Sequence, residues 1–112
     1  MLQLTNDARE NRGRDDLKLD KQLSNYAYDH SKAMADKGEL FHSEDLASVL
    51  GDRDWSMGGE NVGVASSLTD LEAAFMASKT HRQNILQTGF DHAAIGVFES
   101  DGSFWVTVIF YG

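Results

Sequence analysis

Residues 92–111 have the sequence HAAIGVFESDGSFWVTVIFY, and this stretch decides the fold class. Two runs rich in β-branched and aromatic residues, 92–99 and 104–111, predict strands. The four residues between them, Ser100-Asp101-Gly102-Ser103, predict a hairpin, because Asp-Gly suits a tight turn between antiparallel strands. We therefore expect the chain to end in a β-hairpin.

The part of the chain before this hairpin has mainly helical patterns. The strongest begins at Asp20, a good N-cap, and ends at Gly38, with apolar residues recurring at three- and four-residue intervals. Thr69-x-x-Glu72 matches a capping box. Further helices are predicted at 2–11, 44–50, 69–78 and 80–86, a loop at 52–59 and a short strand at 61–65. Because helices precede strands, we predict one α+β domain over residues 1–112.

The composition excludes several partners. The net charge is −8, whereas nucleic acids require a basic surface, so we expect no nucleic-acid partner. No apolar run is long enough to cross a bilayer, and no signal peptide is visible. Cysteine is absent, so the fold is held by packing alone. We expect a monomer.

Three polar residues stand at junctions between predicted elements, where functional groups are often placed. His42 follows the long helix, Glu60 precedes the short strand, and His81 begins a helix. Two imidazoles and a carboxylate can bind a divalent metal or act as a general acid–base set. Each residue can equally be structural, and spacing alone does not separate these interpretations. No cysteine nucleophile, Gly-x-Ser-x-Gly elbow or His-Glu-x-x-His motif is present.

Taken together, five ordered segments resemble a known family. They are Leu4-x-Asn6-x-x-Arg9, Ala27-x-x-His30-Ser31-x-x-Met34-Ala35, Leu40-Phe41-His42-Ser43, Gly59-Glu60-Asn61-Val62-Gly63 and His81-Arg82-Gln83-Asn84-Ile85-Leu86. Ile95-Gly96-Val97 and Phe104-Trp105-Val106-Thr107 resemble the closing strands. The chain is similar along nearly its whole length to CAP domains of the bacterial SCP-like branch, relatives of cysteine-rich secretory, antigen 5 and pathogenesis-related proteins.

The resemblance implies a three-layer α-β-α sandwich with a central antiparallel sheet, in a secreted or cell-surface protein. It also implies a cleft of two histidines and two glutamates that can bind a divalent cation such as zinc. His42 and Glu60 match that set, and His81 matches the histidine of the bacterial His-Arg segment. The resemblance leaves Asn61, Arg82 and Asn84 as structural residues, with Arg82 pairing either with Asp91 or with the end of a helix.

The chain also departs from the family pattern. The second family glutamate corresponds to Ser78, and the second eukaryotic histidine to Phe104 or Trp105. Metal ligation then rests on His42 and His81, which predicts a weak site. We therefore favour an extracellular binding module for a small ligand, lipid, peptide or metal, and we do not expect an enzyme. The alternatives are a metal-assisted hydrolase in the same cleft and an envelope or adhesion scaffold with a vestigial cleft.

Overall fold

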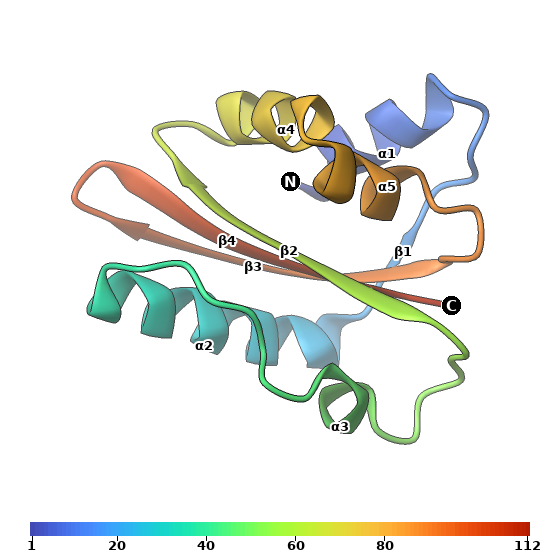
Figure 1. The fold of residues 1–112 in the computed structure, drawn as a ribbon, viewed down its shortest axis with the longest axis horizontal. Helices are drawn as coiled ribbons and strands as arrows, with labels where there is room; N and C mark the ends of the chain where they lie inside the picture. Colours follow the sequence, from blue (N-terminus) through green and yellow to red (C-terminus); the bar gives the residue numbers. More distant parts are fainter.

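A computed structural model describes residues 1–112, which form three layers (Figure 1). One helical layer contains α1 (Leu2–Glu10), α4 (Leu68–Ala77) and α5 (Lys79–Leu86), and the other contains α2 (Lys21–Lys37) and α3 (Leu46–Leu50). Between them lie the strands β1 (Lys18–Leu19), β2 (Gly58–Ala65), β3 (His92–Ser100) and β4 (Ser103–Tyr111). The predicted α+β class and α-β-α sandwich are confirmed. None of the helices combines the length and apolar content that a transmembrane span requires.

The strands follow the order β1-β3-β4-β2 across one sheet. β3 and β4 form the predicted hairpin, with Ser100 opposite Ser103, and β2 pairs antiparallel with the other side of β4. β1 was not predicted: it has only two residues, which is too short for any periodicity, and it pairs in parallel with β3. The three long strands thus form the antiparallel part of the sheet, with β2 at one edge and β1 at the other.

β4 is the strand on which both hydrophobic cores are built. Val106, Val108 and Phe110 face α4 and α5, where they join the larger cluster. Ile109 and Tyr111 alternate with them and join the smaller cluster, on the side of α2 and α3. The almost continuous apolar sequence of this strand is therefore explained by burial on both faces.

Two predicted boundaries are wrong. α4 is capped by Ser67, whose hydroxyl accepts a hydrogen bond from the Asp70 amide at 3.1 Å, so Thr69 does not start the helix. The loop predicted at 52–59 ends earlier, because Gly58 already pairs with Tyr111 at the end of β4. In contrast, Asp20 and Gly38 cap α2 as predicted.

Glu72, the acidic residue of the predicted capping box, has a different place in the structure. Its side chain is buried between α1 and α4, and the residue is 7% exposed. Thr5 donates a hydrogen bond of 3.3 Å to Oε1, while Oε2 has no partner. Desolvation raises the pKa of this carboxyl group, and the hydrogen bond from Thr5 opposes the shift only in part.

Replacing Glu72 by glutamine is expected to stabilise the protein at neutral pH by about 1 kcal/mol, because it removes a buried, half-satisfied charge. A carboxyl whose folded-state pKa is raised weakens the fold as pH rises from its unfolded pKa through its folded pKa. The advantage of the variant should therefore shrink on acidification. Urea denaturation at several pH values measures this, with Glu10→Gln, an exposed position on α1, as the control. A pH-independent difference would contradict the interpretation.

Candidate functional site

His42 and Glu60 form a hydrogen-bonded pair at the edge of the sheet. Nδ1 of His42 lies 2.8 Å from Oε1 of Glu60, with the carboxylate side chain 5% exposed and the imidazole 62% exposed. Glu60 is fixed on β2, opposite Ile109 of β4. The carboxylate accepts a hydrogen bond from Nδ1–H, and Nε2 of His42 has no protein partner.

Ser43 holds the same carboxylate in place. Its backbone amide donates to Oε1 of Glu60 at 2.9 Å, and its hydroxyl donates to Oε2 at 2.6 Å. The hydroxyl of Tyr26, on α2, lies 2.7 Å from the Ser43 oxygen. Neither Ser43 nor Tyr26 was predicted to belong to the site. The only available signals were that Ser43 directly follows His42 and that Tyr26 interrupts the apolar face of α2 with a hydroxyl.

The segment that carries His42 is also tied to α2. Nε2 of the buried His30 lies 2.7 Å from the carbonyl oxygen of Phe41, and the two rings pack edge to face at 4.9 Å. The ammonium group of Lys37 lies 5.4 Å from the centre of the Phe41 ring. The residues on both sides of His42 are therefore held in place: Phe41 by a contact with α2, and Ser43 by its hydrogen bonds to Glu60.

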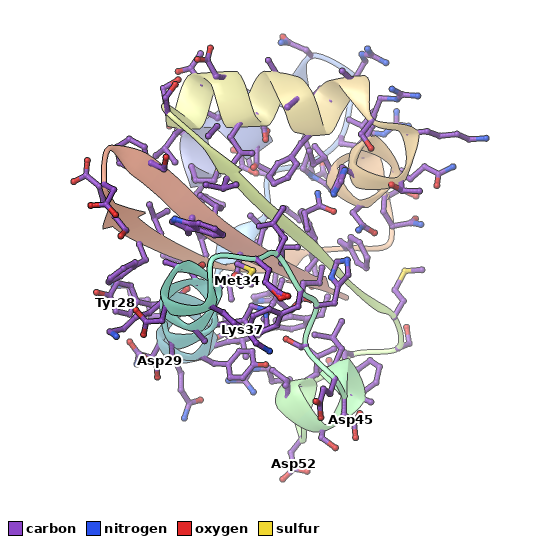
Figure 2. The ribbon with its side chains drawn as sticks, turned by 60° about the vertical axis from the view of Figure 1, so that its left-hand side comes forward. Tyr28, Asp29, Met34, Lys37, Asp45 and Asp52 are labelled. Atoms are coloured by element: carbon purple, nitrogen blue, oxygen red, sulfur yellow. The ribbon has the colours of Figure 1, made fainter.

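A groove of about 660 Å³ lies beside His42, between α2 and the segment leading to α3, and we call it the α2–α3 groove. Figure 2 shows Lys37 from α2 and Asp45 from the segment before α3, both of which line it. The remaining lining residues are Tyr26, His30, Phe41, His42, Ser43, Glu44, Ser48 and Val49. His42 contributes to this groove, whereas Glu60 and His81 do not line it.

His81 lies in the first turn of α5, in the opposite helical layer. Its ring packs against Phe75 at a tilt of 31°, with centroids 5.0 Å apart, and its Nδ1 lies 2.8 Å from the hydroxyl of Ser78. Desolvation lowers the pKa of His81, and the charge of His42 lowers it further. His81 is therefore within electrostatic reach of His42 but forms no hydrogen bond with it or with Glu60. Ser78, the position of the missing family glutamate, orients this ring.

A second polar cluster joins β2 to α5. The side-chain amide of Asn84 donates to Oδ1 of Asn61 at 2.9 Å, and Asn61 donates to the carbonyl of His81 at 3.1 Å. A Cβ atom at Gly59 would lie 2.6 Å from Oδ1 of Asn84, so a larger residue there would displace the Asn84 side chain that donates to Asn61. The buried Asn61 thus fixes the first turn of α5 against the strand that carries Glu60.

Arg82 was expected to pair either with Asp91 or with the end of a helix, and the structure shows the second arrangement. Its Nη1 donates to the carbonyl of Met76 at 2.9 Å, near the C-terminal end of α4, and it forms no ion pair with Asp91. The guanidinium therefore joins α4 to α5.

The donors available to a divalent cation are few. No group of three or more His, Cys, Asp or Glu side chains is arranged to hold a metal ion. Both oxygens of Glu60 are engaged by His42 and Ser43, so this carboxylate serves to orient an imidazole. The residues present fit a weak site at most, with Nε2 of His42 and Nε2 of His81 as ligands. Structural zinc sites use four protein ligands and catalytic ones three.

Comparisons with known proteins agree with the fold. Residues 2–110 match the sequence profile of the CAP family, described as the cysteine-rich secretory protein family. A Bacillus subtilis protein, the uncharacterised YkwD, is 33% identical over 94% of this chain. This chain spans 43% of the length of that relative.

Three of the solved structures with a similar fold are bacterial proteins described as extracellular, outer surface or secretory. An extracellular SCP-domain protein of Bacillus anthracis has a TM-score of 0.83 at 27% identity, over 98% of this chain and 38% of its own. An outer surface protein of Borrelia burgdorferi has a TM-score of 0.86 at 15% identity, and the match covers 98% of this chain and 87% of that protein. A Staphylococcus aureus cysteine-rich secretory protein has a TM-score of 0.78 at 23% identity, and the match covers 98% of this chain and 36% of that protein. The last two show likeness of fold alone.

Proposed function

The chain belongs to the CAP family of cysteine-rich secretory proteins, and on this basis we propose that it is an extracellular binding domain that recognises a polar ligand or a divalent cation through His42. An extracellular or outer-surface description of the similar bacterial structures supports the location. The observation that carries the proposal is the His42–Glu60 pair, because a nearly buried carboxylate holds an exposed imidazole in one tautomer.

This arrangement favours binding for a physical reason. Glu60 is held by three donors, so the His42 ring is oriented before a ligand arrives. Preorganisation of this kind lowers the entropy that binding would otherwise cost. The adjoining α2–α3 groove offers the ligand the aromatic rings of Tyr26 and Phe41 and the charges of Lys37 and Asp45. A small polar molecule or an extended peptide suits such a mixed, open lining.

A divalent cation would be held by Nε2 of His42 and Nε2 of His81. Glu60 and Ser78 orient the two rings through their Nδ1 atoms, and the lowered pKa of His81 keeps that ring unprotonated near neutral pH. When bound, such an ion would act as a Lewis acid towards a ligand oxygen. With two protein ligands, the remaining coordination positions would belong to water or to the ligand, and binding would be weak.

The geometry gives no support to a hydrolase that uses Ser43 as its nucleophile. Ser43 places its hydroxyl beside the pair, but it donates to Glu60 and not to Nε2 of His42. In a serine triad the imidazole must accept the serine proton, and the carboxylate must lie behind the imidazole. Ser43 therefore lies on the wrong side of the imidazole to be activated as a nucleophile.

Zinc titration of the wild type and of His42→Ala tests the proposed cation site. We expect zinc at millimolar concentration to shift the His42 and His81 imidazole resonances and to raise the melting temperature of the wild type only. Glu60→Gln should weaken zinc binding by about tenfold, because it loosens the orientation of His42. His92→Ala, which removes an imidazole paired with Asp91, is the matched control and should bind as the wild type does.

Two outcomes would contradict the proposal. Zinc shifts that persist unchanged in His42→Ala would place the ion elsewhere. Turnover of peptide or ester substrates that Glu60→Gln abolishes would make the domain an enzyme.

A further inference from the structure

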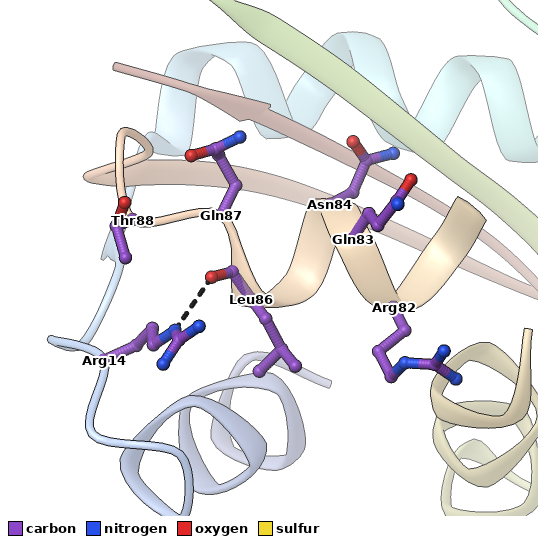
Figure 3. A pocket seen from close by; sticks show the side chains of 7 residues that line it. All are labelled: Arg14, Arg82, Gln83, Asn84, Leu86, Gln87 and Thr88. Carbon is purple, nitrogen blue, oxygen red and sulfur yellow. Dashed lines mark hydrogen bonds between the residues drawn. The ribbon is translucent and has the colours of Figure 1, made fainter. Parts of the chain in front are cut away.

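A second cavity lies beside α5 and shares no lining residue with the α2–α3 groove. It has a volume of about 570 Å³, and Figure 3 shows its lining: Arg14, Arg82, Gln83, Asn84, Leu86, Gln87 and Thr88. The chain carries 18 acidic residues and a net charge of −8, yet none of these seven residues is acidic. Two of them are arginines. This cavity is thus a cationic site on an acidic protein.

The two guanidinium groups have no carboxylate partners. Neither Arg14 nor Arg82 forms an ion pair within 4 Å, whereas Arg53 is paired with Asp20 at 2.7 Å. Three aspartates, Asp15, Asp16 and Asp91, line the neighbouring cavity on the other side of Arg14. The three aspartates are not part of the wall of the cavity beside Arg82. Neither guanidinium at this site is therefore paired directly with a carboxylate.

Backbone carbonyls hold both arginines in place. Nε of Arg14 donates to the Leu86 carbonyl at 3.0 Å, the bond drawn in Figure 3, and its Nη1 donates to the carbonyl of Arg12. Nη1 of Arg82 donates to the Met76 carbonyl at 2.9 Å. These bonds leave Nη2 of Arg14 and both Nε and Nη2 of Arg82 without protein acceptors. Each guanidinium is therefore oriented while keeping N–H groups for a ligand.

Neutral donors surround these groups. The side chain of Gln83 and the hydroxyl of Thr88 form no hydrogen bond within the protein. Gln87 accepts the Gly89 amide through Oε1 at 3.1 Å, which leaves its own amide hydrogens free. Together with the arginines, these residues offer more donors than the two oxygens of a carboxylate would engage. The oxygens of a phosphate group match both the number of donors and the forked geometry of arginine.

We propose that the cavity formed by Arg14, Arg82, Gln83, Gln87 and Thr88 is a binding site for a phosphate group of a ligand. The site is separate from His42 and Glu60, so it does not depend on the proposed function. A terminal phosphate and a phosphodiester share the required chemistry.

The test is a titration with inorganic phosphate at constant ionic strength, followed by NMR of the arginine Nε–H and glutamine side-chain amide signals. We expect saturable shifts of the Arg82, Gln83 and Gln87 signals, and weaker binding of acetate. Gln83→Glu adds a negative charge without breaking a hydrogen bond, and it should weaken phosphate binding by about tenfold or more. Gln22→Glu is the matched control: it makes the same charge change on α2, where the residue still accepts from Arg53.

The remaining arms identify the source of the phosphate and the limits of the proposal. If dimethyl phosphate binds as tightly as inorganic phosphate, the natural ligand carries a phosphodiester. If only inorganic phosphate binds, the ligand carries a terminal phosphate. His42→Ala should bind phosphate as the wild type does, which separates this site from the His42 site. Shifts that do not saturate, equal weakening by both Gln→Glu variants, or equal affinity for acetate would overturn the proposal.

Discussion

Replacing Arg9 by alanine is expected to lower the free energy of unfolding by about 4 kcal/mol, enough to unfold much of a small domain. Arg9 is 1% exposed and has no ion-pair partner. Its guanidinium donates to the carbonyls of Asp15, Ile85, Gln87 and Phe90 at 2.7 to 3.3 Å. Truncation would leave these acceptors without their donor in the protein interior, where each unsatisfied group is costly.

Arg9→Ala should also disturb the two proposed binding sites, because Arg9 contacts the end of α5. Ile85 and Gln87 lie at the end of α5, so Arg9 holds the helix that carries His81 and Arg82. Chemical denaturation followed by circular dichroism measures the loss. Arg12→Ala is the matched control, because that side chain is exposed and donates no hydrogen bond, and it should change stability by less than about 0.5 kcal/mol. Equal stability of the two variants would show that the Arg9 bonds contribute nothing.

Replacing Gly96 by alanine is expected to cost about 3 kcal/mol, because the new methyl group would overlap the backbone of α2. A Cβ atom there meets the backbone atoms of Ala27 and Tyr28, which cannot rotate out of the way. Ser31 confirms the close approach, since its hydroxyl donates to the Gly96 carbonyl at 2.9 Å. The variant must therefore move the helix away from the sheet or bend β3.

Movement of α2 away from the sheet would also change the geometry around His42. The helix carries Tyr26 and leads into the segment that places His42 over Glu60, so the His42 imidazole resonance should shift in any folded fraction of Gly96→Ala. Gly58→Ala is the control within the same sheet. Its Cβ meets the end of the Leu50 side chain at 2.7 Å, which can adjust, so the loss should be about 1 kcal/mol. Similar losses for both variants, measured by urea denaturation, would contradict the interpretation.

Local signals predicted most of the elements. α2 was bounded correctly because its capping residues and its apolar periodicity are local features. The hairpin was predicted for the same reason, since Asp101-Gly102 specifies a tight turn without help from the rest of the chain. The predicted start of α4 was wrong because Ser67 and Thr69 both offer a capping hydroxyl, and in the structure it is Ser67 that accepts from the Asp70 amide.

The candidate site was predictable only in part. His42 and Glu60 stand out through their flanking motifs, and the structure brings them together at 2.8 Å. Ser43 and Tyr26 did not, because a serine or tyrosine acquires a role only from the partner that folding supplies. His81 lies on α5, where it contacts Ser78, and it shares no hydrogen bond with His42 or Glu60 although it is near enough for the charge of His42 to affect it.

By itself the sequence determined the helices and the hairpin, because turn residues, caps and periodicity act between neighbours in the chain, whereas the three-layer class was implied by the resemblance to CAP domains. The tertiary structure alone decided that β4, the second strand of the stretch 92–111, lies between β3 and β2 with both faces buried. That placement sets Glu60 opposite Ile109 and under Ser43, contacts that span from 17 to 49 residues. Such pairings depend on the packing of both helical layers, which no local pattern contains.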